Sequence, residues 1–469
     1  MRGFLFYFYR VITEKTIAFH TLGCKLNFAE SSSISRMLEA EGFRKVKFED
    51  AADVYVINTC SVTENADKEC RSIIRKALRF SPIAQVVVVG CYAQLKPEEI
   101  ASIEGVDLVL GAKEKFRIAD HLKTLPQKKL LSEKATVYSC DVSEVNFFES
   151  SYSFGERTRA FLKVQDGCDY NCTYCTIPLA RGRSRSDTIA HVVEQANLLS
   201  ESGIKEIVLT GVNIGDFGLS RESRDRQNGN RDETFFDLIQ ALDEVEGIER
   251  FRISSIEPNL LRDEIIEFVA QSKRFMPHFH IPLQSGSDKI LKLMKRRYLS
   301  KLYTDRVEKI KSVMPHCCIG ADVIAGFPGE DEKEFLETYN FLNELDISYL
   351  HVFTYSERDS TEAIHLGNVV QKEIRHERNK MLRILSEKKQ RAFYELHLGT
   401  IRKVLFELPN KDGMQEGLSD NYIKVEISTQ KHLRGKIKQV LLRQLNGDFI
   451  LGELHRTKEL SLSHVAAVF

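Results

Sequence analysis

Apolar and polar residues in the first third of the chain alternate between short apolar runs and amphipathic stretches. Three runs of strand length each end in a cysteine; they are residues 16–24, 53–60 and 85–91. Stretches with apolar residues at helical spacing lie between them, at 31–42 and 66–80. Alternating strands and helices predict a parallel sheet, whose ligand sites lie at the carboxyl ends of its strands. We therefore expect Cys24, Cys60 and Cys91 to converge on one sheet edge, although each could instead be a small buried hydrophobe.

The middle of the chain repeats a strand-like run followed by a helix-like one, and only the last run lacks its helix. The six runs are residues 160–165, 205–210, 250–255, 278–283, 319–326 and 348–353. Such units with right-handed crossovers curl into a barrel or wind into an open sheet, and six are too few for the eight-stranded barrel. Unusual polar motifs follow most of these runs, at 165–168, 210–213, 255–258, 282–287 and 322–330. They place the functional end at the carboxyl ends of the strands.

The last hundred residues change character. A charged amphipathic helix is expected at 371–399, and short strands bounded by Gly, Asn and Asp turns follow at 401–408, 421–427, 435–445 and 449–454. This pattern of short strands separated by turn residues predicts a small β-barrel. Between residues 396 and 445 the chain has nine Lys or Arg against five Asp or Glu, so the local charge is basic.

Composition indicates an ordinary soluble enzyme. Of the 469 residues, 42% are hydrophobic and 29% charged, with a formal net charge of zero, so any nucleic-acid contact must be local. The length suggests about three domains, which we place at residues 14–130, 154–385 and 394–458. No apolar run approaches the ~20 residues needed to cross a bilayer. Arg10 interrupts the apolar start and no cleavage site follows, so we expect a cytoplasmic protein, with a solvated loop at 220–233.

Cysteine spacing gives the strongest chemical signal. Cys168, Cys172 and Cys175 have the spacing Cys-x3-Cys-x2-Cys. Three thiolates on a tight loop can hold three corners of a cubane iron–sulfur cluster and leave the fourth iron open. Structural zinc usually wants four protein ligands, and no fourth Cys or His follows at the usual distance, which disfavours zinc. The other four cysteines have no partner pattern and are expected to pack in the interior; they are Cys70, Cys140, Cys317 and Cys318.

Both cysteine sets together resemble the radical S-adenosylmethionine methylthiotransferase family over nearly the whole chain. The resemblance lies in the segments TLGCKLNFAES, NTCSVTENADKECR, QDGCDYNCTYCTIPLARGRSRS, HIPLQSGSDKIL and GFPGE. TLGCKLN and ARGRSRS are most similar to the branch that modifies N6-threonylcarbamoyladenosine at position 37 of tRNA. The fold implied is an N-terminal parallel α/β sheet domain, a central partial (β/α)6 barrel and a C-terminal barrel similar to the RNA-binding TRAM module.

The resemblance implies a transferase with two 4Fe–4S clusters. The cluster on Cys168, Cys172 and Cys175 would bind S-adenosylmethionine and cleave it reductively to a 5′-deoxyadenosyl radical, which requires an electron donor. The second, on Cys24, Cys60 and Cys91, would carry the sulfur that is methylated before transfer. Such cofactors are needed because carbon 2 of adenine is an unactivated C–H that no side-chain acid or base attacks.

Two further sets of residues are expected to bind ligands. Strand-end residues are candidates for S-adenosylmethionine contacts, each with a turn or cap residue as the bland alternative: Thr210, Gly211, Asn213, Glu257, Gln284, Ser285 and Gly326. Basic and aromatic residues are candidates for contacts with the anticodon stem–loop of tRNA, with a solvated face or internal ion pairs as the alternative. They are Arg181, Arg183, Arg185, Tyr422, Lys424, Arg434, Lys436 and Lys438.

Three other functions stay open at this point. Isopentenyladenosine at position 37 of tRNA is the near alternative substrate, and an aspartate of a small-subunit ribosomal protein fits less well. A non-catalytic iron–sulfur protein that binds RNA is an alternative of a different class, but it has no use for six strand–helix units with polar motifs at the strand ends.

Overall fold

The computed structural model describes residues 14–60, 64–125, 134–155, 157–219 and 232–455, with the side chains of residues 64–66 left aside. The apolar start and most of the expected loop at 220–233 lie outside these residues. The chain forms two compact units. The first holds the residues up to Ser153 together with Gly167–Tyr170 and Cys175–Arg183, and the second holds the rest. The three domain boundaries expected from the sequence stay predictions.

The first unit is built on a parallel six-stranded sheet in the order β2-β1-β3-β4-β5-β6. The strands are β1 (Thr16–Thr21), β2 (Arg44–Val46), β3 (Val54–Thr59), β4 (Gln85–Gly90), β5 (Leu108–Leu110) and β6 (Thr136–Tyr138). The helices are α1 (Lys25–Ala40), α2 (Glu64–Phe80), α3 (Cys91–Leu95), α4 (Pro97–Ala101), α5 (Ile118–Thr124) and α6 (Ile177–Arg181). Every residue of β3 is buried, as expected for a strand covered on both faces. The alternation of strands and helices read from the sequence is confirmed.

Short elements complete the first unit: η1 (Lys115–Arg117), η2 (Val142–Glu144) and β7 (Ser151–Tyr152). Two apolar clusters fill the opposite sides of the sheet. One contains Ile57, Val88 and Tyr92, and the other contains Val56, Val87 and Leu110. Neighbouring residues of one strand thus enter different cores, because side chains alternate between the faces of a strand.

The second unit contains six parallel strands in chain order, confirming the central array. They are β8 (Arg159–Lys163), β11 (Glu206–Thr210), β12 (Arg250–Ile253), β13 (His278–Gln284), β14 (Cys318–Ala325) and β15 (Tyr349–Thr354). Ladders join β8-β11-β12 and β13-β14-β15, and the bridge from Ser255 to His280 links the two groups. A short antiparallel pair, β9 (Gln165–Asp166) and β10 (Arg185–Ser186), lies at the start of the array.

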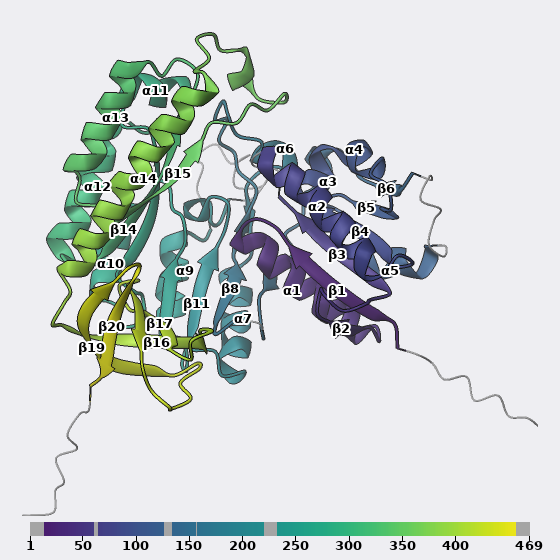
Figure 1. Ribbon diagram of the computed structural model, residues 1–469, viewed down its shortest axis with the longest axis horizontal. Coiled ribbons are helices and arrows are strands. Elements are labelled where there is room, and N and C mark those ends of the chain that lie inside the picture. The colour runs from purple at the N-terminus through teal and green to yellow at the C-terminus, as the bar shows by residue number, and fades with distance from the viewer. Residues whose placement is uncertain (1–13, 61–63, 126–133, 156, 220–231, 456–469) are drawn as a thin grey trace, which may run out of the picture. The chain divides into compact units, whose positions relative to one another are not determined.

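Helices connect these strands and cover their outer side. They are α7 (Ile189–Glu201), α9 (Phe235–Asp243), α10 (Asp263–Gln271), α11 (Asp288–Leu293), α12 (Ser300–Val313), α13 (Glu332–Glu344) and α14 (Lys372–Glu395), with η3 (Ile214–Asp216) and η4 (Glu362–His365). Figure 1 shows α14 running along β15, with α12 and α13 beside it. Among the described helices, none is long and apolar enough to cross a bilayer.

A closed five-stranded barrel ends the chain, in the order β16-β17-β18-β20-β19. Its strands are β16 (Ile401–Pro409), β17 (Gln415–Ser419), β18 (Lys424–Ile427), β19 (Ile437–Asn446) and β20 (Phe449–Leu454). The expected small barrel is confirmed, but the sequence reading missed β17. Arginines of β12 attach this barrel to the strand array, since Arg250 donates to the carbonyl of Lys403 at 2.7 Å and Arg252 to that of Ser419 at 2.7 Å.

Three of the four cysteines expected to pack in the interior do so. Cys70 and Cys317 are fully buried, and Cys318 is 2% exposed. Cys140 is only partly buried, so the expectation of core packing is wrong for this residue.

Candidate functional site

The three N-terminal cysteines follow three neighbouring strands of one sheet. Cys24 comes after β1, Cys60 directly after β3, and Cys91 directly after β4. These strands are adjacent and parallel, in the order β1-β3-β4, and Thr59 pairs with Gly90 at the end of the ladder. The structure therefore brings the three cysteines to one sheet edge, as expected from the sequence.

Two glycines allow the turns that carry these cysteines to approach each other. Gly23 has φ +102°, and a Cβ atom there would lie 2.7 Å from the Cβ atom of Cys60. Gly90 has φ +100° and ψ −166°, and a Cβ atom there would lie 2.4 Å from the carbonyl oxygen of Thr59. Only glycine readily adopts this backbone region. The close approach of the turns thus depends on a missing side chain at both positions.

Asn27 ties the same turns together from the first turn of α1. Its Nδ2 atom donates to the carbonyl of Leu22 at 2.8 Å and to that of Thr59 at 3.0 Å. Its Oδ1 atom lies 3.9 Å from Cys24 Sγ and accepts from Arg181 Nη2 at 2.6 Å. One buried amide therefore holds the turns of Cys24 and Cys60 and binds a guanidinium.

Arg181 does not occupy the surface position expected of an RNA contact. Its side chain is 4% exposed and lies 3.0 Å from Glu30, measured from Nη1 to Oε1. Lys115 Nζ lies 2.7 Å from the same carboxylate oxygen. A guanidinium buried in this ion pair is not available to a phosphate, so the prediction of an RNA contact is wrong for Arg181.

The charges around the first cysteine set suit an iron–sulfur cluster. Burial raises the pKa of the Cys91 thiol above its ordinary value, while the positive charges of Arg181 and Lys115 act in the opposite direction. A cluster requires thiolates, and nearby cations favour them. Three cysteines on one edge with buried cations beside them are a donor set that fits three corners of a cubane cluster.

The second cysteine set lies on a loop fixed by the backbone. Cys168 N donates to the carbonyl of Gly182 at 3.0 Å, and Tyr170 N lies 3.4 Å from Cys168 Sγ. Thr173, next to Cys172, donates through its backbone N–H to the carbonyl of Met294 at 3.2 Å. A backbone N–H directed at a cysteine sulfur is a type of contact that tunes iron–sulfur clusters. Cys168 and Cys175 belong to the first unit and Cys172 to the second, and the ligand role of the three stays a prediction.

Arg296 is a functional candidate that the sequence reading missed. Its Nη1 atom lies 3.1 Å from Cys172 Sγ, and its guanidinium forms an ion pair with Glu257. Burial raises the pKa of the Glu257 carboxyl, and Arg296 opposes this rise. Arg296 follows α11 in a run of basic residues without a recognisable motif, so only the fold reveals that it contacts Cys172 and Glu257.

The residues expected to contact S-adenosylmethionine differ in what their atoms already bind. Asn213 is 2% exposed and its Oδ1 atom is buried without a hydrogen-bond partner among the described residues, which leaves an acceptor for a ligand. Gln284 has φ +72° at a bulge in β13, a strained backbone typical of functional sites. These two and Glu257 are the strongest of the predicted set.

The remaining predicted cofactor residues have structural roles. Thr210 Oγ1 donates to the carbonyl of Leu162 at 3.1 Å, and Ser285 Oγ lies 3.0 Å from Thr338 Oγ1. A Cβ atom on Gly211 would lie 2.9 Å from Gln165 Oε1, and one on Gly326 would lie 2.3 Å from Cγ of Arg375. Backbone groups of two of them are bonded as well, since Gly326 N donates to Glu330 Oε1 at 2.8 Å and Thr210 O accepts from Val164 N at 3.0 Å. The cofactor contacts of these four residues stay predictions.

The residues expected to bind RNA include exposed and internal side chains. The exposed ones are Arg183, Lys424, Arg434, Lys436 and Lys438. Arg185 is instead ion-paired with Asp166 at 3.3 Å. The Tyr422 ring stacks on His278 with centroids 4.0 Å apart. The RNA role of these residues stays a prediction.

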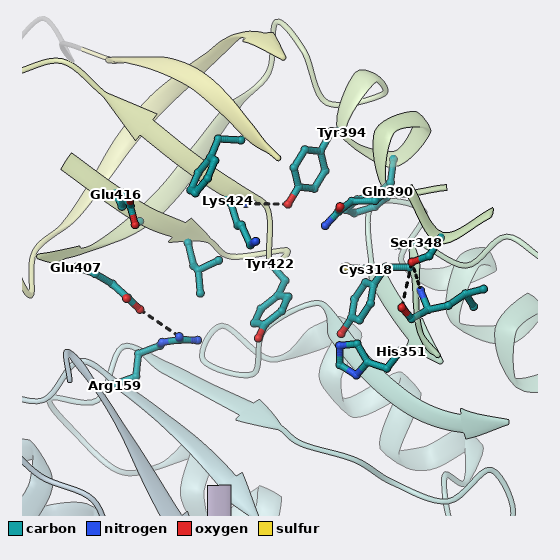
Figure 2. A pocket seen from close by; sticks show the side chains of 17 residues that line it. Arg159, Cys318, Ser348, His351, Gln390, Tyr394, Glu407, Glu416, Tyr422 and Lys424 are labelled. Atoms are coloured by element: carbon teal, nitrogen blue, oxygen red, sulfur yellow. Dashed lines mark hydrogen bonds and ion pairs between the residues drawn. The ribbon is translucent and has the colours of Figure 1, made fainter. Parts of the chain in front are cut away.

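Tyr422 and Lys424 also line a pocket of about 530 Å³ next to the C-terminal barrel. Figure 2 shows Tyr422 and His351 at its floor and Lys424 and Tyr394 above them, with Arg159 paired to Glu407 at its side. Basic, acidic and aromatic side chains face this cavity together, because Glu407 and Glu416 line it beside Arg159 and Lys424.

Comparison with known proteins assigns the chain. Residues 16–111 match the model of the uncharacterized protein family UPF0004, and residues 162–342 match that of the radical SAM superfamily. The threonylcarbamoyladenosine tRNA methylthiotransferase MtaB of Bacillus subtilis is 38% identical over 456 residues, covering 95% of this chain and 97% of the relative. The MtaB of Aquifex aeolicus is 39% identical over 428 residues, covering 91% and 100%. The chain belongs to the radical S-adenosylmethionine methylthiotransferase family.

Another methylthiotransferase relative carries a different name. The tRNA-2-methylthio-N(6)-dimethylallyladenosine synthase of Wolinella succinogenes is 33% identical over 448 residues and covers 94% of this chain and 99% of the relative. Among solved structures, the radical S-adenosylmethionine methyltransferase TsrM of Kitasatospora setae has a TM-score of 0.50 at 15% identity, covering 75% of this chain and 77% of that one. This likeness supports the fold alone.

Membership of the methylthiotransferase family also accounts for the two cysteine sets. Enzymes of this family use S-adenosylmethionine and two 4Fe–4S clusters, as expected from the sequence. The donor set at the N-terminal sheet edge fits such a cluster.

Proposed function

We propose that this methylthiotransferase adds a methylthio group to carbon 2 of N6-threonylcarbamoyladenosine at position 37 of tRNA. The observation that carries the proposal is the convergence of Cys24, Cys60 and Cys91 on one sheet edge, in a chain with a second cysteine set at radical SAM spacing. Relatives named for threonylcarbamoyladenosine are 34–39% identical to this chain, and those named for dimethylallyladenosine are 31–33% identical.

The proposed ligand assignment follows the two sets of cysteines. Cys168, Cys172 and Cys175 hold the cluster that binds S-adenosylmethionine, and Cys24, Cys60 and Cys91 hold the second cluster. When bound, these cofactors supply the radical and the sulfur chemistry that carbon 2 of adenine requires. Arg296 holds Cys172 in place and neutralises the buried carboxylate of Glu257, so that both side chains keep a fixed position at the cluster loop.

Strand-end residues are proposed to bind the cofactor around this loop. Asn213 offers its buried Oδ1 atom as an acceptor, and Glu257 offers a carboxylate oxygen to an amino group. The positive φ of Gln284 turns the backbone at the end of β13, where this residue is proposed to meet the cofactor. The other proposed contacts are Thr210, Gly211, Ser285 and Gly326.

We further propose that the anticodon stem–loop binds exposed basic residues. They are Arg183, Lys424, Arg434, Lys436 and Lys438, with Arg185 and Tyr422 as candidates that would first have to leave internal contacts. A tRNA substrate and thiolate clusters favour a cytoplasmic location with a low-potential electron donor. The division into domains at 14–130, 154–385 and 394–458 belongs to the same proposal.

Isopentenyladenosine is the second candidate substrate. Its support is the match over more than 90% of the chain to relatives named for dimethylallyladenosine. Their identity to this chain, 31–33%, is close to the 34–39% of the MtaB relatives. The two modified bases differ in polarity, because the threonyl group carries a carboxylate and the isopentenyl group is a hydrocarbon.

The test is a reaction of reconstituted protein with three anticodon-arm RNAs that carry threonylcarbamoyladenosine, isopentenyladenosine or plain adenosine. We expect a methylthio adduct by nucleoside mass spectrometry only with the first RNA, and none with protein in which Cys172 is replaced by alanine. Turnover of the isopentenyl RNA alone would move the protein to the other branch. Cleavage of S-adenosylmethionine without an adduct on any RNA would contradict a tRNA substrate.

A further inference from the structure

Three charged side chains lie buried beside the cysteine edge of the first unit. Glu30 on α1 is fully buried, Lys115 in η1 is 5% exposed, and Arg181 at the end of α6 is 3% exposed. Both cations contact one carboxylate oxygen, at 2.7 Å from Lys115 Nζ and 3.0 Å from Arg181 Nη1. We call these three residues the buried charge cluster.

The buried charge cluster is joined to the cysteine turns through Asn27. The amide accepts from Arg181 at 2.6 Å, and it donates to the carbonyls of Leu22 and Thr59, each of which lies one or two residues before a cysteine. Helix α6, which ends at Arg181, also contacts α3, which begins at Cys91. Any group held by the three cysteines would therefore lie within the electrostatic field of the buried charge cluster.

Arg181 lies just after the second cysteine set in the sequence. It lies six residues after Cys175, in the segment Cys175–Arg183 that belongs to the first unit. Its helix α6 contacts α3, which begins with Cys91. The segment that carries a ligand of the S-adenosylmethionine cluster thus also provides a charge for the surroundings of the second cluster.

The stability of the folded protein does not by itself explain the buried charge cluster. Replacing a buried ion pair by apolar residues is often neutral or stabilising, because desolvation offsets much of the Coulomb attraction. The reduction potential of an iron–sulfur cluster, in contrast, depends directly on nearby charge and on burial. A charge fixed in a dry site next to the cysteines has a lasting effect on that potential.

We propose that Glu30, Lys115 and Arg181 are positioning residues that set the reduction potential of the cluster held by Cys24, Cys60 and Cys91. The inference rests on the proposed ligand assignment. A positive charge stabilises the reduced, more negative cluster and raises its potential, whereas Glu30 lowers it. Arg181 lies on the segment Cys175–Arg183, so its effect on this potential also depends on where that segment lies.

The test uses full-length protein in which Cys168, Cys172 and Cys175 are replaced by alanine, so that only the second cluster can load. After anaerobic reconstitution, the iron content is measured first. A redox titration followed by electron paramagnetic resonance then gives the midpoint potential. The parent is compared with Arg181→Gln, Glu30→Gln and the double variant, which change the local charge by minus one, plus one and zero. Arg185→Gln, which removes an arginine paired with Asp166 instead, is the control.

We expect Arg181→Gln to lower the potential and Glu30→Gln to raise it, each changing the oxidised-to-reduced ratio at fixed potential at least tenfold. For a one-electron couple, tenfold corresponds to about 59 mV. The double variant and the control should stay near the parent. Shifts in one common direction, or no shift, would overturn the proposal, since structural damage has no charge order.

If one variant fails to load the iron–sulfur cluster, two further variants still test the proposal. Lys115→Gln makes the same change of charge as Arg181→Gln from another element and should lower the potential in the same way. Arg181→Lys keeps the charge and should retain the parent's potential. If the parent itself binds no iron, the ligand assignment fails, and that outcome is distinct from a loaded cluster whose potential ignores these charges.

Discussion

Replacing Gly90 by alanine should displace the backbone at the sheet edge that carries Cys24, Cys60 and Cys91. Gly90 has φ +100° and ψ −166°, a region that is essentially restricted to glycine and costs other residues about 1–3 kcal/mol. The new Cβ atom would lie 2.4 Å from Thr59 O and 2.7 Å from Thr59 N, both backbone atoms that cannot rotate away. Overpacking adds about 1–3 kcal/mol, so we expect a loss of about 2–6 kcal/mol.

The displaced backbone would carry Cys91 with it, since that residue follows directly. We therefore expect Gly90→Ala to lower the midpoint of the first unit's unfolding transition in calorimetry of the apoprotein. It should also lower the iron bound in the background that lacks the Cys168 loop cysteines. Gly42→Ala is the matched control, because Gly42 has φ +91° with no atom within 4 Å of an added Cβ.

Gly42→Ala carries backbone strain of about 1–2 kcal/mol without a clash, and it should retain full iron content. If Gly90→Ala bound as much iron as the parent and unfolded no earlier than Gly42→Ala, the link between this close approach and the cysteine edge would be refuted.

Three other predictions address the second unit. Glu206→Gln leaves the buried guanidinium of Arg252, 2.8 Å from the carboxylate, without its counter-charge, and should cost about 3–5 kcal/mol in urea denaturation; an unchanged free energy would contradict the pairing. Burial raises the pKa of Asp322, but the nearby His280 and His351 outweigh this and hold it below its ordinary value. The stabilisation is thus present at neutral pH and lost as the pH falls below about 4, so Asp322→Asn should flatten the acid limb of a pH–stability curve, and an equally steep limb would count against it. Charge reversal at Lys436 and Lys438 should weaken tRNA binding and reduce the slope of log K against log salt by about 0.9 per lost phosphate contact. Lys301→Glu, at an exposed position of α12, should leave the slope unchanged, and equal slopes for both variants would exclude this surface.

Local patterns were sufficient for most of the fold. Apolar runs of strand length predicted β1, β3 and β4, and parallel strands predicted the shared edge that brings Cys24, Cys60 and Cys91 together. Strand β17 escaped because its sequence, QEGLS, has a polar start and a glycine at its centre. Gly417 is required there because a Cβ atom would lie 2.6 Å from Leu405 O on the preceding strand β16, with which β17 forms an antiparallel hairpin.

The candidate site shows the same limit. The spacing of Cys168, Cys172 and Cys175 is local, so the sequence contains it in full. Arg181 looked like part of a surface run of arginines, and its true partner, Glu30, is 151 residues away in the chain. Arg296 is likewise 124 residues from Cys172. Contacts of this range follow from tertiary structure, and no window along the sequence contains both partners.

The most direct test of the proposed function is nucleoside mass spectrometry of tRNA from a host that lacks its own methylthiotransferases, with and without this protein. We predict that 2-methylthio-N6-threonylcarbamoyladenosine appears with the parent protein and is absent with the Cys168→Ala variant. Unchanged threonylcarbamoyladenosine in cells that contain protein with both clusters loaded would contradict the account.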